Sequence, residues 1–389
     1  MVKNFKIYES GYTEGNGKEK DEDDIKNYLK NFLSSNVNFN VLIGSGASLP
    51  AINTMGRTFN DIKTSGQYTD ELSDLKKKYT KSYLGKNDEN FENIELFLSW
   101  LGNRINGADD GELNLNEKQI KYYIINELIK SIYDGFDNDS ENNRKTQSYY
   151  ESFLKRLVFL KEMSNDQNDI INIFTPNYDL FLEQSLDKIG FSYTDGFRNS
   201  FNPYFDTSQF NRRPVDITQR FRDKWSVIKP FFRIYKLHGS LNWKRDQNGI
   251  KRNNNLVSSD TLGADKTVIA PTSSKYADSQ GSPFSDLFRE FSIELTKPNS
   301  ILLVNGFGFG DQHINDFIKQ ALQRTDFKLI AFVDEDNKNT LNFMQQVGPN
   351  SEASFITNGK ENEAKDAHHF ETLSNLLSFN DPFEVRDDE

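Results

Sequence analysis

Four short segments carry side chains suited to chemistry, and in each of them these side chains follow a run of mostly apolar residues. The first is the loop Gly44-Ser45-Gly46-Ala47-Ser48, which follows the apolar run Val-Leu-Ile at 41–43. Small residues leave backbone amides open to a phosphate, and the two serine hydroxyls add hydrogen-bond donors. The glycine spacing lacks the complete dinucleotide fingerprint, so a tight turn without a ligand is the alternative.

The second segment is the turn 174–179, Phe-Thr-Pro-Asn-Tyr-Asp, which lies between an apolar run and a helical pattern of apolar residues. Asn177 and Asp179 therefore occupy a strand-to-helix turn, facing the place where a ligand would lie. The alternative is that they cap the helix, a role that both residue types favour.

The third segment, 235–243, reads Tyr-Lys-Leu-His-Gly-Ser-Leu-Asn-Trp and places His238 at the end of a strand-like run. An imidazole has an ordinary pKa of about 6.5, so at neutral pH it can accept a proton from a reacting group. In the alternative, structural hydrogen bonds occupy both ring nitrogens of His238.

The fourth segment, 301–315, starts with the apolar run Ile-Leu-Leu-Val and continues through Asn305 into alternating glycines and a helical pattern. This order brings backbone and small polar groups against a nucleoside. We expect Asp311 to cap the following helix and His313 to lie on one face of it.

The elements that position these segments are predicted to be strands alternating with helices. Strand-like runs recur at 170–174, 234–237, 267–270, 301–304 and 329–333, several of them followed by polar or glycine turns. This alternation predicts an α/β fold with a mostly parallel sheet that is covered on both faces. Ligands of such sheets bind at the carboxyl ends of the strands, where all four segments lie.

One part of the chain departs from this alternation. Between residues 57 and 168 apolar residues recur at helical spacing, which predicts a largely helical insertion. Within it, the stretch 134–148 is rich in Asp, Asn and Ser and is expected to be an exposed loop. We expect residues 1–389 to form a single domain that contains this insertion.

The composition narrows the possible functions. A net charge of -11 argues against a surface that is basic throughout and binds nucleic acid non-specifically. The chain has no cysteine, which excludes disulfides, thiolate nucleophiles and cysteine-based zinc sites. The sequence also lacks a signal-peptide pattern and any apolar stretch of about 18 residues, so we expect a cytoplasmic protein without membrane association.

Taken in order, the four segments resemble the SIR2 (sirtuin-like) family, and the resemblance covers roughly residues 38–335. It implies a Rossmann-like sheet that binds NAD⁺, with Gly44, Ser45, Gly46, Ala47 and Ser48 around the pyrophosphate. It places Asn177 and Asp179, with Thr175 of the same turn, near the nicotinamide and its ribose. It also implies that His238 is the base beside the ribose hydroxyls, and that the adenosine end lies near Asn305, Gly306 and Phe307.

The sequence differs from protein-deacylating sirtuins in one feature, and this difference indicates the subtype. Protein-deacylating sirtuins carry a small domain built around four zinc-binding cysteines, and this chain has none, so no metal site and no zinc are expected. The sequence is closer to bacterial SIR2-like effectors of antiphage defence, which resemble NAD⁺ hydrolases releasing nicotinamide and ADP-ribose. Similarity to stand-alone members of this type implies a homo-oligomer and a HerA-type hexameric ATPase as a partner.

Two other classes of function compete with this one. Basic and aromatic residues alternate over 211–236, so DNA binding or a nuclease subunit is conceivable. A solvated surface with its aromatic side chains in the core, or a protein interface, would show the same pattern. The other class is a module that senses NAD⁺ or ADP-ribose without turnover, although binding alone does not require both Asn177 and His238.

Overall fold

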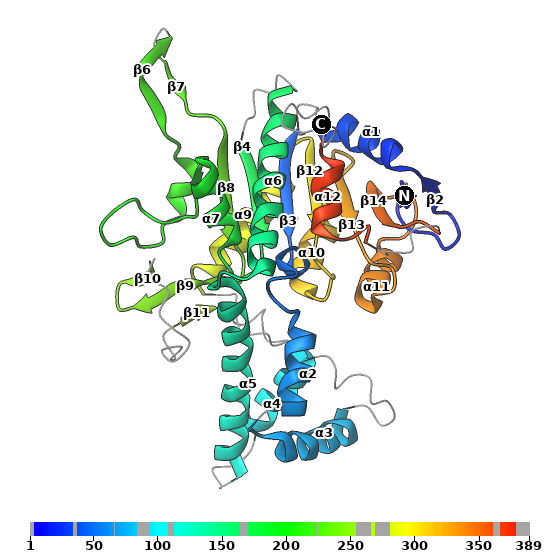
Figure 1. The fold of residues 1–389 in the computed structure, drawn as a ribbon, viewed down its shortest axis with the longest axis vertical. Coiled ribbons are helices and arrows are strands. Elements are labelled where there is room, and N and C mark those ends of the chain that lie inside the picture. Colours follow the sequence, from blue (N-terminus) through cyan, green and yellow to red (C-terminus); the bar gives the residue numbers. More distant parts are fainter. Residues whose placement is uncertain are drawn as a thin grey trace.

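The computed structural model describes residues 4–33, 37–65, 67–83, 94–107, 113–163, 170–221, 224–253, 266–268, 281–360 and 366–378. Its centre is a nine-stranded sheet in the order β2-β1-β14-β13-β12-β3-β4-β8-β5 (Figure 1). These strands are β1 (Phe5–Tyr8), β2 (Lys18–Lys20), β3 (Asn38–Ile43), β4 (Ile170–Thr175), β5 (Ser192–Thr194), β8 (Phe231–Lys236), β12 (Ser300–Asn305), β13 (Phe327–Phe332) and β14 (Ala353–Asn358).

The sheet is parallel from β14 to β5, and only β1 and β2 run antiparallel to their neighbours. The predicted α/β class and the mostly parallel, Rossmann-like sheet are therefore confirmed. The strand predicted at 267–270 is an exception. β11 (Lys266–Val268) pairs antiparallel with β9 (Gly239–Asp246) in a separate sheet that also contains β10 (Gly249–Arg252), and residues 269–270 lie outside the described residues.

The strand order creates a switch point beside β3. From β3 the chain builds outward to β4 and β8, and much later it returns to pair β12 with the other edge of β3. The two crossovers leave β3 in opposite directions, and ligands of open α/β sheets bind at the carboxyl ends of the strands beside such a switch point. All six residues of both strands are buried, as their apolar runs predicted.

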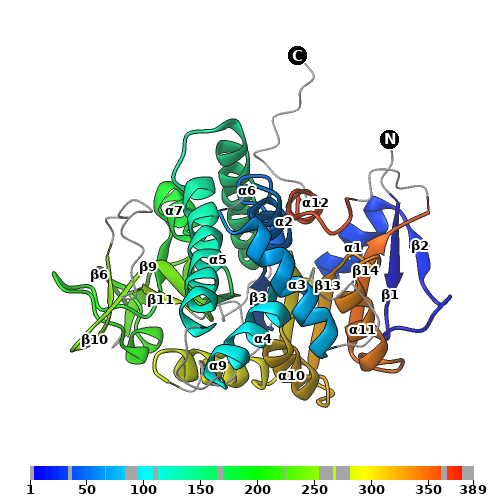
Figure 2. The ribbon, with the colours of Figure 1, turned by 90° about the horizontal axis from the view of Figure 1, so that it is seen from below.

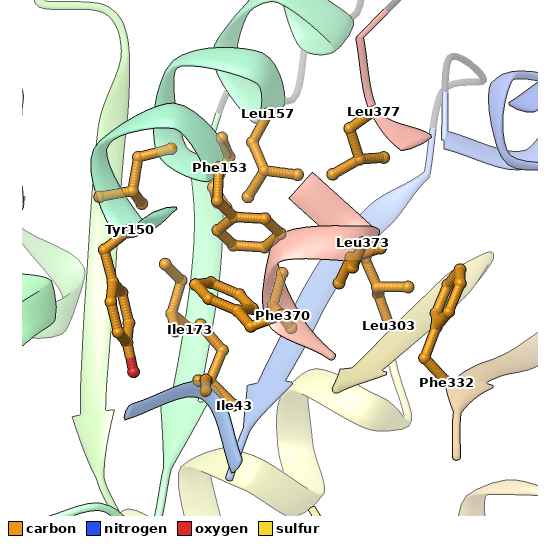
Figure 3. Packing of buried hydrophobic residues seen from close by; sticks show 14 of the residues in the cluster. Ile43, Tyr150, Phe153, Leu157, Ile173, Leu303, Phe332, Phe370, Leu373 and Leu377 are labelled. Atoms are coloured by element: carbon orange, nitrogen blue, oxygen red, sulfur yellow. The ribbon is translucent and has the colours of Figure 1, made fainter. Parts of the chain in front are cut away.

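Helices cover both faces of the sheet (Figure 2). One face packs against α1 (Glu22–Leu33), α6 (Glu141–Met163), α7 (Phe181–Ile189) and α12 (Phe370–Leu376). The other face packs against α9 (Phe284–Leu295), α10 (Gln312–Ala321) and α11 (Lys338–Val347). Figure 3 shows the first of these layers, where Phe153 of α6 and Phe370 of α12 meet Ile173 of β4. Burying each such side chain contributes about 1.5–3 kcal/mol to folding.

The helical part of the chain lies mostly apart from the sheet. α2 (Met55–Ser65), α3 (Thr69–Tyr83), α4 (Ile94–Asn106) and α5 (Leu113–Phe136) share a core cluster of their own and extend below the sheet in Figure 1. In contrast, α6 belongs to the layer that covers the sheet.

The loop expected over 134–148 is mostly helical, so that prediction is wrong. α5 continues to Phe136 and α6 already begins at Glu141, which leaves only a short turn between them. The polar residues that suggested a loop stabilise this turn instead. Asn143 donates from Nδ2 to the carbonyl oxygens of Gly135 and Phe136, and the Ser140 hydroxyl accepts from the Asn143 amide at 3.1 Å.

Two smaller features complete the described fold. β6 (Val215–Phe221) and β7 (Lys224–Val227) form an antiparallel hairpin that projects at the upper left of Figure 1. Among the residues that the structure describes, no helix combines the length and apolar character needed to span a bilayer.

Candidate active site

The loop after β3 lies directly against the loop after β12. The Gly44 amide donates to the Asn305 carbonyl and the Gly46 amide donates to the Gly306 carbonyl, both at 2.9 Å. A Cβ on Gly44 would lie 2.3 Å from the Gly306 oxygen, and one on Gly306 would lie 2.5 Å from the Ala47 nitrogen. Gly306 also has a φ of 68°, which disfavours side chains. The glycines therefore allow two backbones to meet at the switch point of the sheet.

These hydrogen bonds limit which parts of the 44–48 loop can reach a ligand. The amides of Gly44 and Gly46 are engaged as described, and the Ala47 amide donates to the Gly44 carbonyl at 3.1 Å. Ser45 is exposed, whereas Ser48 is buried. Ser45 is thus the residue of this loop best placed to contact a phosphate without disturbing the turn.

Asn177 joins this loop to the turn after β4. Its Nδ2 donates to the Gly44 carbonyl at 3.0 Å and to the Ser48 hydroxyl at 3.2 Å. Ser48 in turn donates from Oγ to Asp179 Oδ2 at 2.8 Å, and Asp179 Oδ1 accepts from the Phe181 amide at the start of α7. The side chains of the first two sequence motifs therefore form one buried hydrogen-bond network.

Thr175 fixes the backbone at the start of the same turn. Its hydroxyl donates to the Ile43 carbonyl at 2.7 Å and accepts from the Asn177 amide at 3.0 Å. Thr175 thus ties the ends of β3 and β4 together, because one hydroxyl bonds to both. This positions Asn177 over the end of β3.

Two residues that the sequence did not single out support this network. Tyr150 of α6 places its hydroxyl 3.3 Å from Ser48 Oγ, and burial raises the pKa of Tyr150 well above its usual value. Lys236 is buried, donates from Nζ to the Asp179 carbonyl, and lies 3.5 Å from Glu183 Oε1. Burial raises the pKa of Glu183, and the Lys236 charge opposes that rise.

His238 follows β8 in the same way that Asn177 follows β4. Thr175 pairs with Lys236 in the parallel ladder, and each candidate residue comes two positions after its member of that pair. The Leu237 amide still donates to the Thr175 carbonyl at 2.8 Å, so the two backbone segments stay side by side beyond the ends of the strands. Neighbouring strands are about 4.8 Å apart, so the register brings these two residues to adjacent strand ends.

His238 also contacts a residue in the loop after β12. Its Nε2 lies 3.0 Å from Asp311 Oδ2, and the two side chains are only 5% and 6% exposed. β8 is separated from β12 by β4 and β3, so this contact requires the loop after β12 to cross the ends of both strands. The loop 306–311 therefore carries Asp311 from the end of β12 to His238.

One known family model matches part of this chain. The model of the SIR2-like domain matches residues 171–350. That segment is similar to a SIR2-like domain. The match includes the residues after β4, β8 and β12 but begins beyond the 44–48 loop, and no curated protein matches the chain. SIR2-like domains act on NAD⁺, which supports an NAD-related activity for this chain.

Asp311 makes two kinds of contact in this region. Its Oδ1 accepts from the amides of His313 and Ile314 at 3.0 and 3.3 Å, so it caps α10 as the sequence predicted. The contact of its other oxygen with His238 was not foreseen. The sequence did indicate that His238 and Asp311 both follow strands of one sheet. It did not show that the loop carrying Asp311 crosses two strands to reach His238.

The residues expected near adenosine lie at the end of β12. Asn305 is fully buried, and its Nδ2 donates to the His368 carbonyl at 3.1 Å. Its Oδ1 is buried without a hydrogen-bond partner among the residues that the structure describes. Phe307 packs edge-on against Phe309, with ring centroids 5.1 Å apart. Asn305 therefore retains an acceptor beside the glycine contact.

His313 is only partly buried and packs between aromatic rings. Its ring centroid is 4.3 Å from that of Phe288 and 5.0 Å from that of Phe317. Burial lowers the pKa of His313, and the Asp311 charge partly opposes this. His313 thus lies on a helix face, as expected, whereas the buried His238 contacts Asp311.

The basic and aromatic segment 211–236 divides between the core and the hairpin. In β8, Arg233 and Lys236 form ion pairs with buried acids, and three aromatic side chains are buried, namely Phe231, Phe232 and Tyr235. On the hairpin, Arg220 lies over the exposed Trp225 ring at 5.1 Å. Arg222 and Asp223 lie outside the described residues. DNA binding stays a prediction, and the hairpin is the part of the segment best placed for it.

Carboxylates and imidazoles of the kind found at these strand ends can also bind metal ions. Within the described ranges, no three His, Cys, Asp or Glu side chains gather closely enough to hold a metal ion. The groups collected here are an amide, an imidazole, a carboxylate and hydroxyls. Such a set suits acid–base chemistry and the orientation of sugar hydroxyls.

Proposed function

We propose that this chain is an NAD⁺ glycohydrolase that cleaves NAD⁺ into nicotinamide and ADP-ribose. The proposal rests on two observations at the carboxyl ends of the strands, the register of β4 with β8 and the contact between His238 and Asp311. Asn177 and His238 follow adjacent strands in register, and Asp311 closes over them from the loop after β12. The Gly44–Gly306 contact lies beside them, at the switch point where open sheets bind dinucleotides.

In the proposed reaction the bond between the ribose C1′ and the nicotinamide nitrogen breaks. Its electron pair leaves with nicotinamide, which departs as a neutral molecule, so the leaving group requires no acid. A water oxygen forms the new bond to C1′, and one proton of that water passes to His238. The enzyme must therefore orient the water and stabilise the positive charge that develops on the ribose.

The contacts of each residue support its role. Both hydrogen bonds of Asn177 Nδ2 hold the amide in place, so that Oδ1 is the acceptor that orients a ribose hydroxyl or the water. Asp311 lies 3.0 Å from His238 Nε2, where its charge stabilises the imidazolium that forms when His238 takes the proton. Asp179 acts indirectly, because its carboxylate fixes Ser48 and the start of α7.

The biological setting belongs to the same proposal. We propose that NAD⁺ depletion serves antiphage defence, with the chain acting as a homo-oligomer beside a HerA-type ATPase. The assay should therefore compare the purified chain with the complex that co-purifies with products of neighbouring genes. Activity in either preparation supports the glycohydrolase, whereas binding of NAD⁺ without turnover in both would favour a sensor.

The test is to follow nicotinamide release from NAD⁺ by chromatography. We expect His238→Ala and Asn177→Ala each to reduce release by about 10²-fold or more, the range for losing a base or an orienting group. His369→Ala is the matched control, since His369 is exposed and precedes α12. Undiminished release from both site variants would overturn the assignment.

A further inference from the structure

The face of the sheet that packs on α9 changes character along the strands. At the carboxyl ends this face is apolar, with Leu42 of β3 and Phe174 of β4 in the core cluster. Towards the amino ends the residues on the same face are polar, namely Asn38 and Asn40 of β3, Asn172 of β4 and Arg233 of β8. Burying polar groups costs free energy unless they are hydrogen-bonded, so this end of the sheet requires an explanation.

Most of these polar groups converge on Glu294 of α9, which is 2% exposed. Asn172 donates from Nδ2 to Glu294 Oε2 at 3.2 Å and to Asn40 Oδ1 at 3.0 Å. Arg233 and Lys297 both reach Glu294 Oε1, at 3.3 and 2.7 Å. Asn38 donates to the Glu294 carbonyl at 2.7 Å. One carboxylate thus holds two cations and an amide at fixed positions.

These fixed groups line a cavity of about 370 Å³ at the amino ends of the strands. Two cations, Arg233 and Lys297, and two amides, Asn38 and Asn172, face it together with Ile170. Asn172 is 1% exposed, and its Oδ1 is buried without a hydrogen-bond partner among the described residues. The network therefore leaves one acceptor unused beside a space that two cations line.

We propose that this cavity binds a small organic anion that also carries a hydroxyl or amino group. Arg233 and Lys297 attract the carboxylate or phosphate, and Asn172 Oδ1 accepts a hydrogen bond from the hydroxyl or amine. The volume suits a ligand at the small end of the usual range. The site is distinct from the candidate active site, because the six residues of β3 separate the two ends of the sheet by about 20 Å.

Lys297 offers a test that leaves the network standing. Its side chain is 42% exposed, and Glu294 keeps Arg233 when Lys297 is replaced. The experiment is isothermal titration of the full chain with glycerol 3-phosphate, L-malate and sulfate. The first two distinguish a phosphate from a carboxylate ligand, and sulfate lacks the hydroxyl that Asn172 would bind.

We expect one of the hydroxylated anions to bind more tightly than sulfate, and Lys297→Met to weaken that binding about tenfold or more. Lys297→Arg should bind like the original chain, since it retains the charge. Lys319→Met is the matched control. Like Lys297, Lys319 forms an ion pair with an acid three residues earlier, in its case Asp316 on α10 at 2.9 Å. No binding by any of the three anions, or equal binding by Lys297→Met, would overturn the proposal.

Discussion

The two ends of the central strands are built in different ways. At the carboxyl ends the proposed chemistry lies in loops, where glycines let backbones meet and the polar side chains follow the strands. At the amino ends the polar groups belong to the strands themselves and are held by Glu294 from the covering helix. The comparison shows that one sheet can support a site made by loop motifs and another made by a buried network.

The charge of Asp311 is the sharpest way to break the carboxyl-end site. Asp311→Asn should keep the α10 cap, because Asn337 caps α11 in this same chain. It should still reduce nicotinamide release by about 10²- to 10³-fold, since a neutral amide cannot stabilise an imidazolium. Steady-state assays check this, with Asp316→Asn as the control on the exposed face of α10. Equal activity would show that the contact with His238 is structural.

The backbone contact at the switch point can be tested through stability. Gly306→Ala should lower the free energy of unfolding by about 3 kcal/mol or more, because a Cβ there meets the Ala47 nitrogen and also adds left-handed strain. Gly190→Ala is the control. Its φ is 77° and its ψ is 25°, which is left-handed, yet a Cβ would find no atom within 4 Å, so only strain of about 1 kcal/mol should appear. Equal losses in urea unfolding would contradict the close approach.

The amino-end network should respond to the loss of one charge. Glu294→Gln keeps the shape of the side chain but leaves Arg233 and Lys297 without their shared carboxylate. We expect the free energy of unfolding to fall by about 2 kcal/mol or more, because a buried cation loses its partner. Urea unfolding measures this, while nicotinamide release at a permissive temperature should stay unchanged. If folded Glu294→Gln protein also lost turnover, the result would show that the amino-end network affects the carboxyl-end site.

The smallest expected effect concerns pH. Burial lowers the pKa of His313 below its ordinary value, so the folded state favours the neutral ring. Its contribution to stability is complete above a pH of about 6.5 and is lost as the pH falls through the lowered folded-state pKa. His313→Phe should therefore flatten the decline in stability between pH 7 and pH 5. An unchanged slope in thermal unfolding at several pH values would remove His313 as a cause.

The sequence correctly predicted that its motifs follow strand ends, because each is a contiguous segment after an apolar run, and their role as an active site stays a prediction. It also predicted the sheet, since β3, β4 and β12 are apolar runs bounded by polar or glycine turns. It missed the short turn at 137–140. The polar residues there, with Asn143 and Ser140 among them, suggested a longer loop, but these two side chains stabilise a tight connection between helices. Composition alone does not tell capping residues from loop residues.

The amino-end cavity was beyond sequence reasoning for a different physical reason. Asn172, Arg233 and Glu294 are far apart in the chain, and each is a single polar residue within or beside an apolar run. Only the sheet register and the position of α9 bring them together. The same limit hid the contact between His238 and Asp311, which depends on a loop that crosses two strands.

The most direct test of the central claim is a crystal structure of the chain with a non-hydrolysable analogue of NAD⁺. The account predicts that the diphosphate lies by Ser45 and the Gly44–Gly306 contact, with the ribose C1′ between Asn177 and His238. Electron density for the dinucleotide in the amino-end cavity, or anywhere away from these residues, would contradict it.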